Sequence, residues 1–207
     1  MDRVRAIPGY KPYFDEVFGE DAMTVENAAK AVAAFERTLI TPGSPYDRYV
    51  SGDKKAMSEQ QVRGMNTFAS TGCVACHSGA AFNGPEMEFG KGFYSKFPTF
   101  ADSKYVSQYK LDQDKGRADV TGDEADTNMF RVPTLRNITD TAPYFHNGSV
   151  NDLHEAVRVM AKTQLNRDLA DTDVDDIVAF LTALTGEYPV ITMPRLPATT
   201  GTSLVVD

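Results

Sequence analysis

Residues 73–77 read Cys73-Val74-Ala75-Cys76-His77, and this short stretch decides how the rest of the chain has to fold. The chain has 207 residues and only two cysteines, so a framework of several disulfides is excluded by count. Two thiols three positions apart, followed directly by an imidazole, are typical of covalent haem attachment. The thiols add to the two vinyl groups of the haem, and the histidine binds the iron from one side.

Two other interpretations of this motif fit less well. A redox dithiol usually follows a strand in a βαβ unit, whereas the residues before Cys73 have helical spacing. A zinc site needs a second pair of ligands, but there is no further cysteine, and His146 and His154 lie far away with the wrong spacing. We therefore predict one covalent haem c, bound through Cys73, Cys76 and His77.

Composition limits the class of protein further. Apolar residues make up 42% and charged residues 24% of the chain, as in globular proteins whose core can enclose a cofactor. The net charge of −8 argues against a nucleic-acid partner, which needs basic patches, and favours a basic protein partner. No apolar run reaches the length of a membrane span, and no apolar stretch of a signal peptide follows Met1.

Helical patterns precede the motif. Lys11–Phe18 has Pro12 in its first turn and Gly19 after its end. Thr24 is the expected cap of a second helix, whose apolar face consists of Val25, Ala28, Ala29, Val32, Phe35 and Leu39.

A third helix leads directly into the motif. Ser58 and Gln61 form a capping box at its start, and Gly72 ends it. Its predicted inward stripe consists of Val62, Met65, Phe68 and Ala69.

Residues 78–128 are expected to form a long irregular loop. Two interpretations stay open: a surface loop anchored by a few rings, or a segment that packs on the haem and closes one edge of it. The loop contains the aromatic residues Phe82, Phe89, Phe93, Tyr94, Phe97, Phe100, Tyr105 and Tyr109.

Two helices are predicted after the loop. Ser149 is expected to open the first, with Asp152 three residues on. The second starts near Thr172, carries aspartates at its positive end and stops at Gly186. The predicted elements are nearly all helical, so the expected fold class is all-α. We expect a single cytochrome c domain over 1–207, with a helical extension (1–50), a haem core (51–187) and an extended tail (188–207).

The order of helix, haem motif, long loop and final helix is the plan of a class I cytochrome c. Gly64 and Phe68 resemble the N-terminal helix of that fold, and Asp176–Leu184 resembles its C-terminal helix. The two helices cross in that fold with a small residue at the contact. The resemblance therefore implies that Gly64 lies at the crossing.

Longer stretches resemble one family. Phe130–Asn137 reads FRVPTLRN, Thr141–Ser149 reads TAPYFHNGS, and Ala34–Thr38 reads AFERT. With Gly116-Arg117, these stretches resemble the bacterial di-haem cytochrome c peroxidases. The similarity runs from about residue 10 to residue 197 and corresponds to that family's C-terminal half, the electron-transfer domain with the high-potential haem.

The sequence departs from this family in one respect. The family carries a second, peroxidatic haem on an N-terminal domain with its own CxxCH, and this chain has no second CxxCH and no tryptophan. The distal histidine, the acid–base glutamate and the inter-haem tryptophan of the family are missing too. We therefore expect an excised domain or fragment rather than a stand-alone mono-haem relative.

The chain has eight methionines that compete as the second axial ligand of the iron. Met57 and Met65 precede the motif and Met193 lies beyond the final helix, so the methionines that we consider as ligands are Met87, Met129 and Met160. His146 and His154 are nominal alternatives. The resemblance favours Met160, because the family's ligand lies in the helix after the His-x-Gly segment.

The resemblance also implies a calcium site. In the family, backbone carbonyls of a Thr-x-Pro segment bind the ion, which corresponds to Thr141 and Pro143 here. Arg136 and His146 have two open interpretations: they face the second haem domain or the haem propionates, or they buttress the turn between Pro133 and Gly148.

Two functions from different classes follow. The first is a periplasmic electron-transfer domain that takes electrons from a mono-haem cytochrome c or a cupredoxin and relays them to the peroxidatic haem. The alternative is an enzyme whose haem reduces H2O2 directly at an open sixth site; a base near the peroxide, which this chemistry wants, is not evident in the sequence. A weaker third idea is a haem-based sensor or structural domain.

Overall fold

The computed structural model describes residues 1–88 and 90–198 and divides into two compact units. The first unit contains residues 1–41 and the tail from residue 188, and the second contains residues 42–187. The expected haem core thus gains residues 42–50, and the expected extension and tail belong together. The single-domain assignment stays a prediction. Phe89 and residues 199–207 of the expected tail lie outside the described residues.

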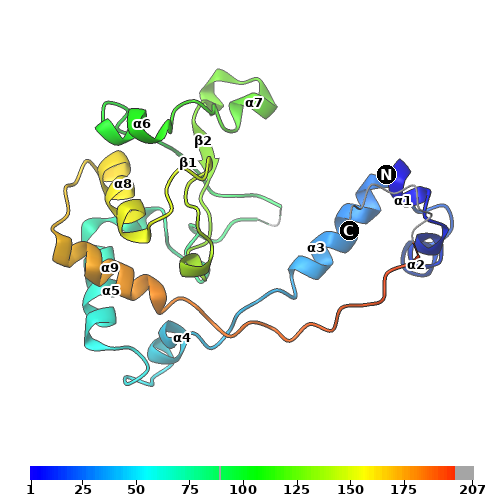
Figure 1. The fold of residues 1–207 in the computed structure, drawn as a ribbon, viewed down its shortest axis with the longest axis horizontal. Coiled ribbons are helices and arrows are strands. Elements are labelled where there is room, and N and C mark those ends of the chain that lie inside the picture. Colours follow the sequence, from blue (N-terminus) through cyan, green and yellow to red (C-terminus); the bar gives the residue numbers. More distant parts are fainter. Residues whose placement is uncertain (89, 199–207) are drawn as a thin grey trace. The chain divides into compact units, whose positions relative to one another are not determined.

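The first unit is built from short helices (Figure 1). The predicted helix at Lys11–Phe18 is confirmed, and so is the cap at Thr24, whose Oγ1 accepts a hydrogen bond from the Asn27 amide at 3.1 Å. The apolar face of the helix after Thr24 lies exposed, with Val25 at 69% and Val32 at 56% of their full accessibility. The helices of this unit are α1 (Asp2–Arg5), the 3₁₀ turn η1 (Pro8–Tyr10), α2 (Lys11–Phe18) and α3 (Val25–Glu36).

The second unit is mainly helical, with a single two-stranded sheet among its described residues. The all-α expectation holds at this level. Its helices and 3₁₀ turns are α4 (Pro45–Val50), α5 (Glu59–Thr71), η2 (Cys73–Ala75), α6 (Lys104–Tyr109), α7 (Ala118–Thr121), η3 (Glu124–Asp126), η4 (Ile138–Asp140), α8 (Leu153–Leu165) and α9 (Asp171–Thr182). The strands are β1 (Tyr94–Lys96) and β2 (Met129–Arg131).

Helices α5 and α9 cross in Figure 1, and their contact is the most extensive between any two elements that the structure describes. Gly64 lies at their contact, as expected: a Cβ there would overlap the Asp176 carbonyl and come within 3.0 Å of the Phe180 Cβ. Next to it, the Arg63 guanidinium donates two hydrogen bonds of 3.1 Å to the Asp176 carboxylate. Phe68 and Phe180 pack against each other beneath the crossing, with ring centroids 5.4 Å apart.

The caps of α5 are those expected from the sequence. The Ser58 hydroxyl accepts from the Gln61 amide at 3.2 Å, and the Gln61 side chain accepts from the Ser58 amide at 2.9 Å. Gly72 ends the helix in the left-handed conformation, with φ of +105°. A side chain is strained at such a φ, so glycine is the natural residue at this C-terminus.

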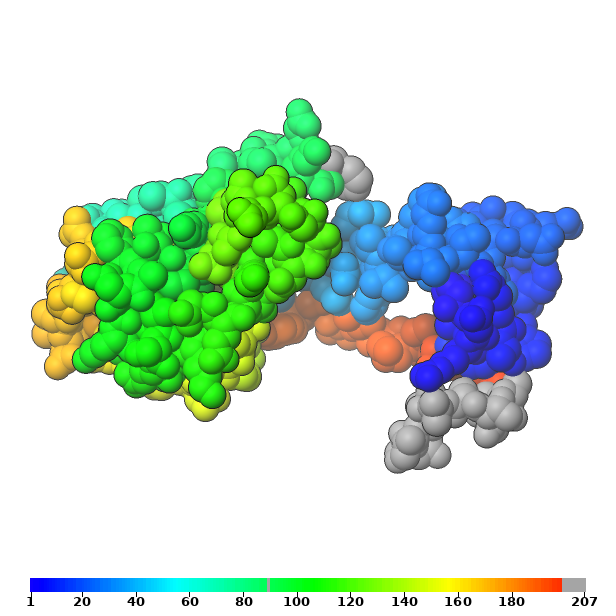
Figure 2. All heavy atoms as spheres, turned by 90° about the horizontal axis from the view of Figure 1, so that it is seen from above, coloured from blue at the N-terminus to red at the C-terminus, as the bar shows by residue number. Residues whose placement is uncertain are grey.

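The segment expected to be one irregular loop contains regular structure. β1 and β2 pair antiparallel, with Ser95 opposite Phe130. In the sequence, helices α6 and α7 lie between β1 and β2. This segment (green) covers one face of the second unit in Figure 2. The expectation of an irregular loop over residues 78–128 was therefore wrong where β1, α6, α7 and η3 form, and the rest of the described segment is irregular. β1 pairs with β2 across more than 30 residues, and no local pattern reveals such pairing.

Two helix boundaries also differ from the expected ones. The cap of α8 is Asp152, whose Oδ1 accepts from the Glu155 amide at 2.8 Å, and not Ser149. α9 ends at Thr182, before Gly186, whose amide donates instead to the Asn137 Oδ1 at 3.1 Å. No helix within the described ranges is both long enough and apolar enough to cross a membrane.

We predict that Gly64→Ala lowers the free energy of unfolding of the haem-loaded protein by about 1–3 kcal/mol, because the added methyl group forces α5 away from the Asp176 carbonyl. Urea unfolding followed by circular dichroism measures the change. Gln60→Ala, at an exposed position of the same helix, is the control. An effect no larger than that of the control would contradict the close packing of the crossing.

Candidate functional site

A cavity of about 380 Å³ lies in the second unit, which is within the usual range of about 300–1,000 Å³ for ligand sites. Its walls come from the end of α5, strands β1 and β2, the segment from Pro133 to His146, and α8. Every predicted site residue lines it: Cys73, Cys76, His77, Thr141, Pro143 and Met160. The structure therefore brings together residues that are up to 87 positions apart in the sequence.

The CxxCH residues form a tight turn directly after α5. Cys73–Ala75 is a 3₁₀ turn, and the His77 amide donates a hydrogen bond of 2.9 Å to the Cys73 carbonyl. Both cysteines are free thiols and half-buried. In a haem-loaded protein, these two sulfur atoms would be the thioether sulfurs that join the chain to the cofactor. Burial raises the pKa of the Cys73 thiol to about 11.

His77 is held in one orientation and one tautomer. The residue is 8% exposed, and its Nδ1 lies 3.0 Å from the Phe82 carbonyl oxygen. Since a carbonyl only accepts hydrogen bonds, Nδ1 carries the hydrogen and Nε2 keeps its lone pair. Burial lowers the pKa of His77, against the opposing effect of the Phe82 hydrogen bond. A neutral imidazole with a free Nε2 is the form that binds a metal.

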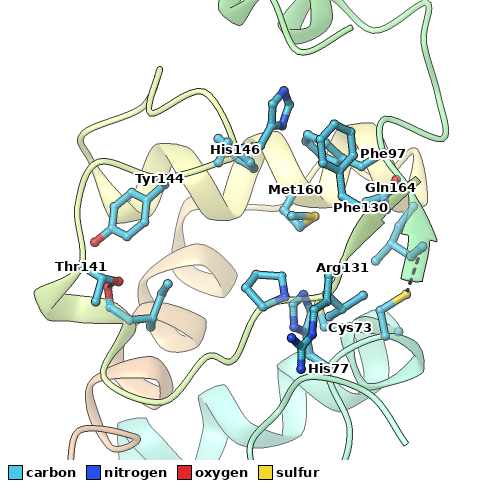
Figure 3. A pocket seen from close by; sticks show the side chains of 18 of the residues that line it. Cys73, His77, Phe97, Phe130, Arg131, Thr141, Tyr144, His146, Met160 and Gln164 are labelled. Carbon is cyan, nitrogen blue, oxygen red and sulfur yellow. Dashed lines mark hydrogen bonds between the residues drawn. The ribbon is translucent and has the colours of Figure 1, made fainter. Parts of the chain in front are cut away.

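Met160 projects from α8 on the other side of the cavity. Figure 3 shows its thioether near the middle of the view, with His77 below it. Of the three methionines that the sequence left as candidates, Met160 lines the cavity, whereas Met87 and Met129 do not. Met87 is 44% exposed, and Met129 lies in β2. The donor atoms and the apolar wall fit a haem held by two thioethers between His77 and Met160.

Aromatic residues form part of the cavity wall. Phe97 and Phe130 both line it, with ring centroids 6.5 Å apart. Phe97 belongs to the segment expected to be a loop, which favours the haem-packing interpretation for this ring. Phe82, from the same segment, packs instead against Phe180 in the helical core.

His146 lies at the edge of the cavity. Its ring stacks on Phe130 at a centroid distance of 4.3 Å and points away from the side where His77 lies (Figure 3). Burial lowers the pKa of His146, and Asp114 opposes this. The geometry does not favour His146 as an alternative to Met160.

Arg136 buttresses a loop and does not line the cavity. Its guanidinium donates to the Ala80 carbonyl at 2.8 and 2.9 Å and to the Asp47 carboxylate at 2.8 Å. Burial alone would raise the pKa of Asp47, but hydrogen bonds from Arg136 and Ser44 outweigh it and hold the pKa below its usual value. The sequence offered a buttress of the turn between Pro133 and Gly148, whereas the side chain of Arg136 holds the loop at Ala80 and the start of α4.

Thr141 and Pro143 line the cavity side by side with Tyr144. Within the part of the chain that the structure describes, no three His, Cys, Asp or Glu side chains gather closely enough to hold a metal ion. A calcium site here would depend on backbone carbonyls, as the sequence resemblance implies.

Two contributions to the site escaped the sequence analysis. One is the Phe82 carbonyl, a backbone group that no residue pattern identifies. The other is Gln164, which lines the cavity while its amide group joins α8 to β1 and the following residues. Its Nε2 donates to the Lys96 carbonyl at 2.9 Å, and its Oε1 accepts from the Thr99 amide at 2.9 Å.

The chain is similar to a well-defined set of proteins. A family model described as di-haem cytochrome c peroxidase matches residues 1–55. The cytochrome c551 peroxidase of Nitrosomonas europaea is 43% identical over 194 residues, 94% of this chain and 54% of that protein. The cytochrome c551 peroxidase of Pseudomonas aeruginosa is 40% identical over 200 residues, 96% of this chain and 55% of that protein. The chain spans about half the length of the curated relatives it matches.

A solved structure shares the fold. The crystal structure of a MauG-like protein associated with microbial copper homeostasis superposes with a TM-score of 0.62 at 24% identity. The superposition covers 84% of this chain and 61% of that protein. At this identity the likeness concerns the fold alone.

We predict that Asp47→Asn lowers the free energy of unfolding at pH 7 by about 1–2 kcal/mol, because the half-buried Arg136 loses its charged partner. The pKa of Asp47 is lowered in the folded state, so its contribution is complete above about 3.9, the pKa of an unfolded aspartate. As the pH falls through the lower pKa that Asp47 has in the folded state, this contribution to stability is lost. Urea unfolding at pH 7 and pH 3 should therefore show a smaller difference from wild type at pH 3.

Asp102→Asn, at an exposed aspartate, is the control and should have little effect at either pH. An effect of Asp47→Asn that is equally large at pH 3 would contradict the ionic origin of the contribution.

Proposed function

The chain belongs to the di-haem cytochrome c peroxidase family, and on this premise we propose that its second unit is an electron-transfer domain with one haem c. The observation that carries the proposal is a single cavity lined by Cys73, Cys76, His77 and Met160. The family implies haem c as a cofactor and a redox protein as a partner. A helical, class I cytochrome c-like arrangement around the haem is part of the same proposal.

Each side chain has a separate role in this proposal. Cys73 and Cys76 tether the cofactor through thioether bonds. His77 presents Nε2 to the iron, because the Phe82 carbonyl holds Nδ1. Met160 supplies a soft thioether from the opposite side, and such a ligand favours the ferrous state. Phe97 and Phe130 exclude water from the cavity.

Bound haem c would supply one-electron chemistry at its iron. If His77 and Met160 both hold the iron, the domain would exchange electrons and would not bind peroxide. We propose that a mono-haem cytochrome c or a cupredoxin is the electron donor. The negative net charge of −8 would favour a donor with a basic face.

The chain spans about half of its curated relatives, so the role within a larger assembly is also a proposal. We propose that this domain relays electrons to a peroxidatic haem domain, where H2O2 is reduced. A periplasmic location and a calcium ion on the Thr141 and Pro143 carbonyls belong to the same proposal. Both follow from the family resemblance.

We predict that the haem-loaded wild type is low-spin in the ferric state, with the weak long-wavelength band of iron–sulfur ligation. Met160→Ala should lose this band and lower the reduction potential, because the ligand that favours the ferrous state is gone. Optical spectra of the ferric and ferrous proteins at neutral pH, with a potentiometric titration, measure both effects. Met129→Ala is the matched control and should keep the band.

The opposite pattern would support the alternative function. A high-spin wild type, or a band lost in Met129→Ala instead, would refute Met160 ligation. An open sixth site would favour direct H2O2 reduction at this haem, which the consumption of H2O2 by the isolated protein would reveal.

A further inference from the structure

We propose that Arg136 is a positioning residue for His77: it fixes the segment whose Phe82 carbonyl accepts the hydrogen bond from the His77 Nδ1. The inference rests on the proposed haem ligation by His77 and adds a residue that does not itself line the haem cavity. It assigns to Arg136 control of the electron-donating strength of the proximal ligand.

The Arg136 side chain links the Ala80 carbonyl to the start of α4. Its Nε and Nη2 donate to the same Ala80 carbonyl, at 2.9 and 2.8 Å. The other side of the guanidinium is anchored on α4, where Nη1 donates to the Ser44 hydroxyl at 3.1 Å and Nη2 to the Asp47 carboxylate at 2.8 Å. The Arg136 side chain is 19% exposed. Its bonds to Ser44 and Asp47 are partly buried, whereas its two bonds to the Ala80 carbonyl lie at the surface.

A second side chain of the same segment holds the next residue of the loop. The Thr134 hydroxyl donates to the Ala81 carbonyl at 2.6 Å. Thr134 and Arg136 therefore hold two consecutive carbonyls, and Phe82 follows directly. The guanidinium of Arg136 also lies 5.4 Å from the centroid of the Phe82 ring.

Phe82 needs such support because its backbone is strained. Its φ is +53°, in the left-handed region that a phenylalanine adopts only when its surroundings enforce it. The buried ring, 7% exposed, and the two held carbonyls provide this enforcement. When the hold on Ala80 weakens, the Phe82 peptide can relax, and its carbonyl then moves away from Nδ1.

The consequence for the haem follows from the hydrogen bond. Donation by Nδ1–H makes Nε2 a stronger electron donor to the iron. A weaker hydrogen bond therefore destabilises the ferric state relative to the ferrous state and raises the reduction potential. A residue that only supported the fold would change the stability and leave this potential unchanged.

The test uses two variants of the haem-loaded protein that keep its charge. Arg136→Lys retains the cation but cannot reproduce the planar fork on Ala80, Ser44 and Asp47. Thr134→Val removes the hydroxyl that donates to Ala81. Arg63→Lys is the matched control, because it breaks a two-bond arginine–carboxylate pair with Asp176 on α5, away from the loop.

Three quantities are measured for each protein: the solvent-exchange rate of the His77 Nδ1 hydrogen by NMR, the reduction potential and the free energy of unfolding. Arg136→Lys should exchange about fivefold faster or more, the equivalent of one ordinary hydrogen bond of about 1 kcal/mol. Its potential should rise. Thr134→Val should change both quantities in the same direction, and Arg63→Lys should change only the stability.

Unchanged exchange and potential in both loop variants would overturn the inference and leave Arg136 a structural residue. If Arg136→Lys does not fold, Thr134→Val decides the question. Failure of the proposed function is distinguishable, because a wild type without covalent haem would show it in its own spectrum. In that case both proposals would fall.

Discussion

The close crossing of α5 and α9 is the contact on which the second unit depends. Gly64 allows the α5 backbone to touch the Asp176 carbonyl, and Phe68 and Phe180 fill the space beside it. Because Gly72 ends α5 at a defined residue, the crossing also determines where the CxxCH turn emerges. A looser contact between the two helices would shift Cys73 and His77 relative to α8, which packs on α9.

The cavity is assembled from segments that serve different purposes. The CxxCH turn brings the reactive groups, and α8 brings the thioether from the other side. The strands β1 and β2 carry rings and small polar groups to the wall, with Gln164 joining α8 to the end of β1. Behind the histidine, the loop held by Thr134 and Arg136 presents a single carbonyl. The proposed haem ligands are thus supported by backbone groups as much as by side chains.

The sequence predicted the helix ends that depend only on neighbouring residues. The capping box at Ser58 and Gln61, the cap at Thr24 and the terminal Gly72 all lie where the sequence indicated, because each satisfies backbone groups within a few residues. The CxxCH motif and the family resemblance likewise predicted the side chains that line the cavity. Whether these residues bind haem stays a prediction.

The rest depends on contacts between distant residues. β1 and β2 are only three residues long and pair because the fold brings them together, so no alternation of side chains announced them. The start of α8 was misplaced because Ser149 and Asp152 are both good caps, and only the geometry selects Asp152. The left-handed Phe82 could not be foreseen, because no local residue pattern marks a phenylalanine with a positive φ.

The sequence separation across the central crossing has a kinetic meaning. Arg63 and Asp176 are 113 positions apart, so closing the chain between them costs much conformational entropy before the core gains any contact. Helix α5 and the CxxCH turn depend only on neighbouring residues and can form early. During synthesis, a chain of this kind would therefore hold its two thiols in nearly their final arrangement, and still accessible, before α9 closes the fold.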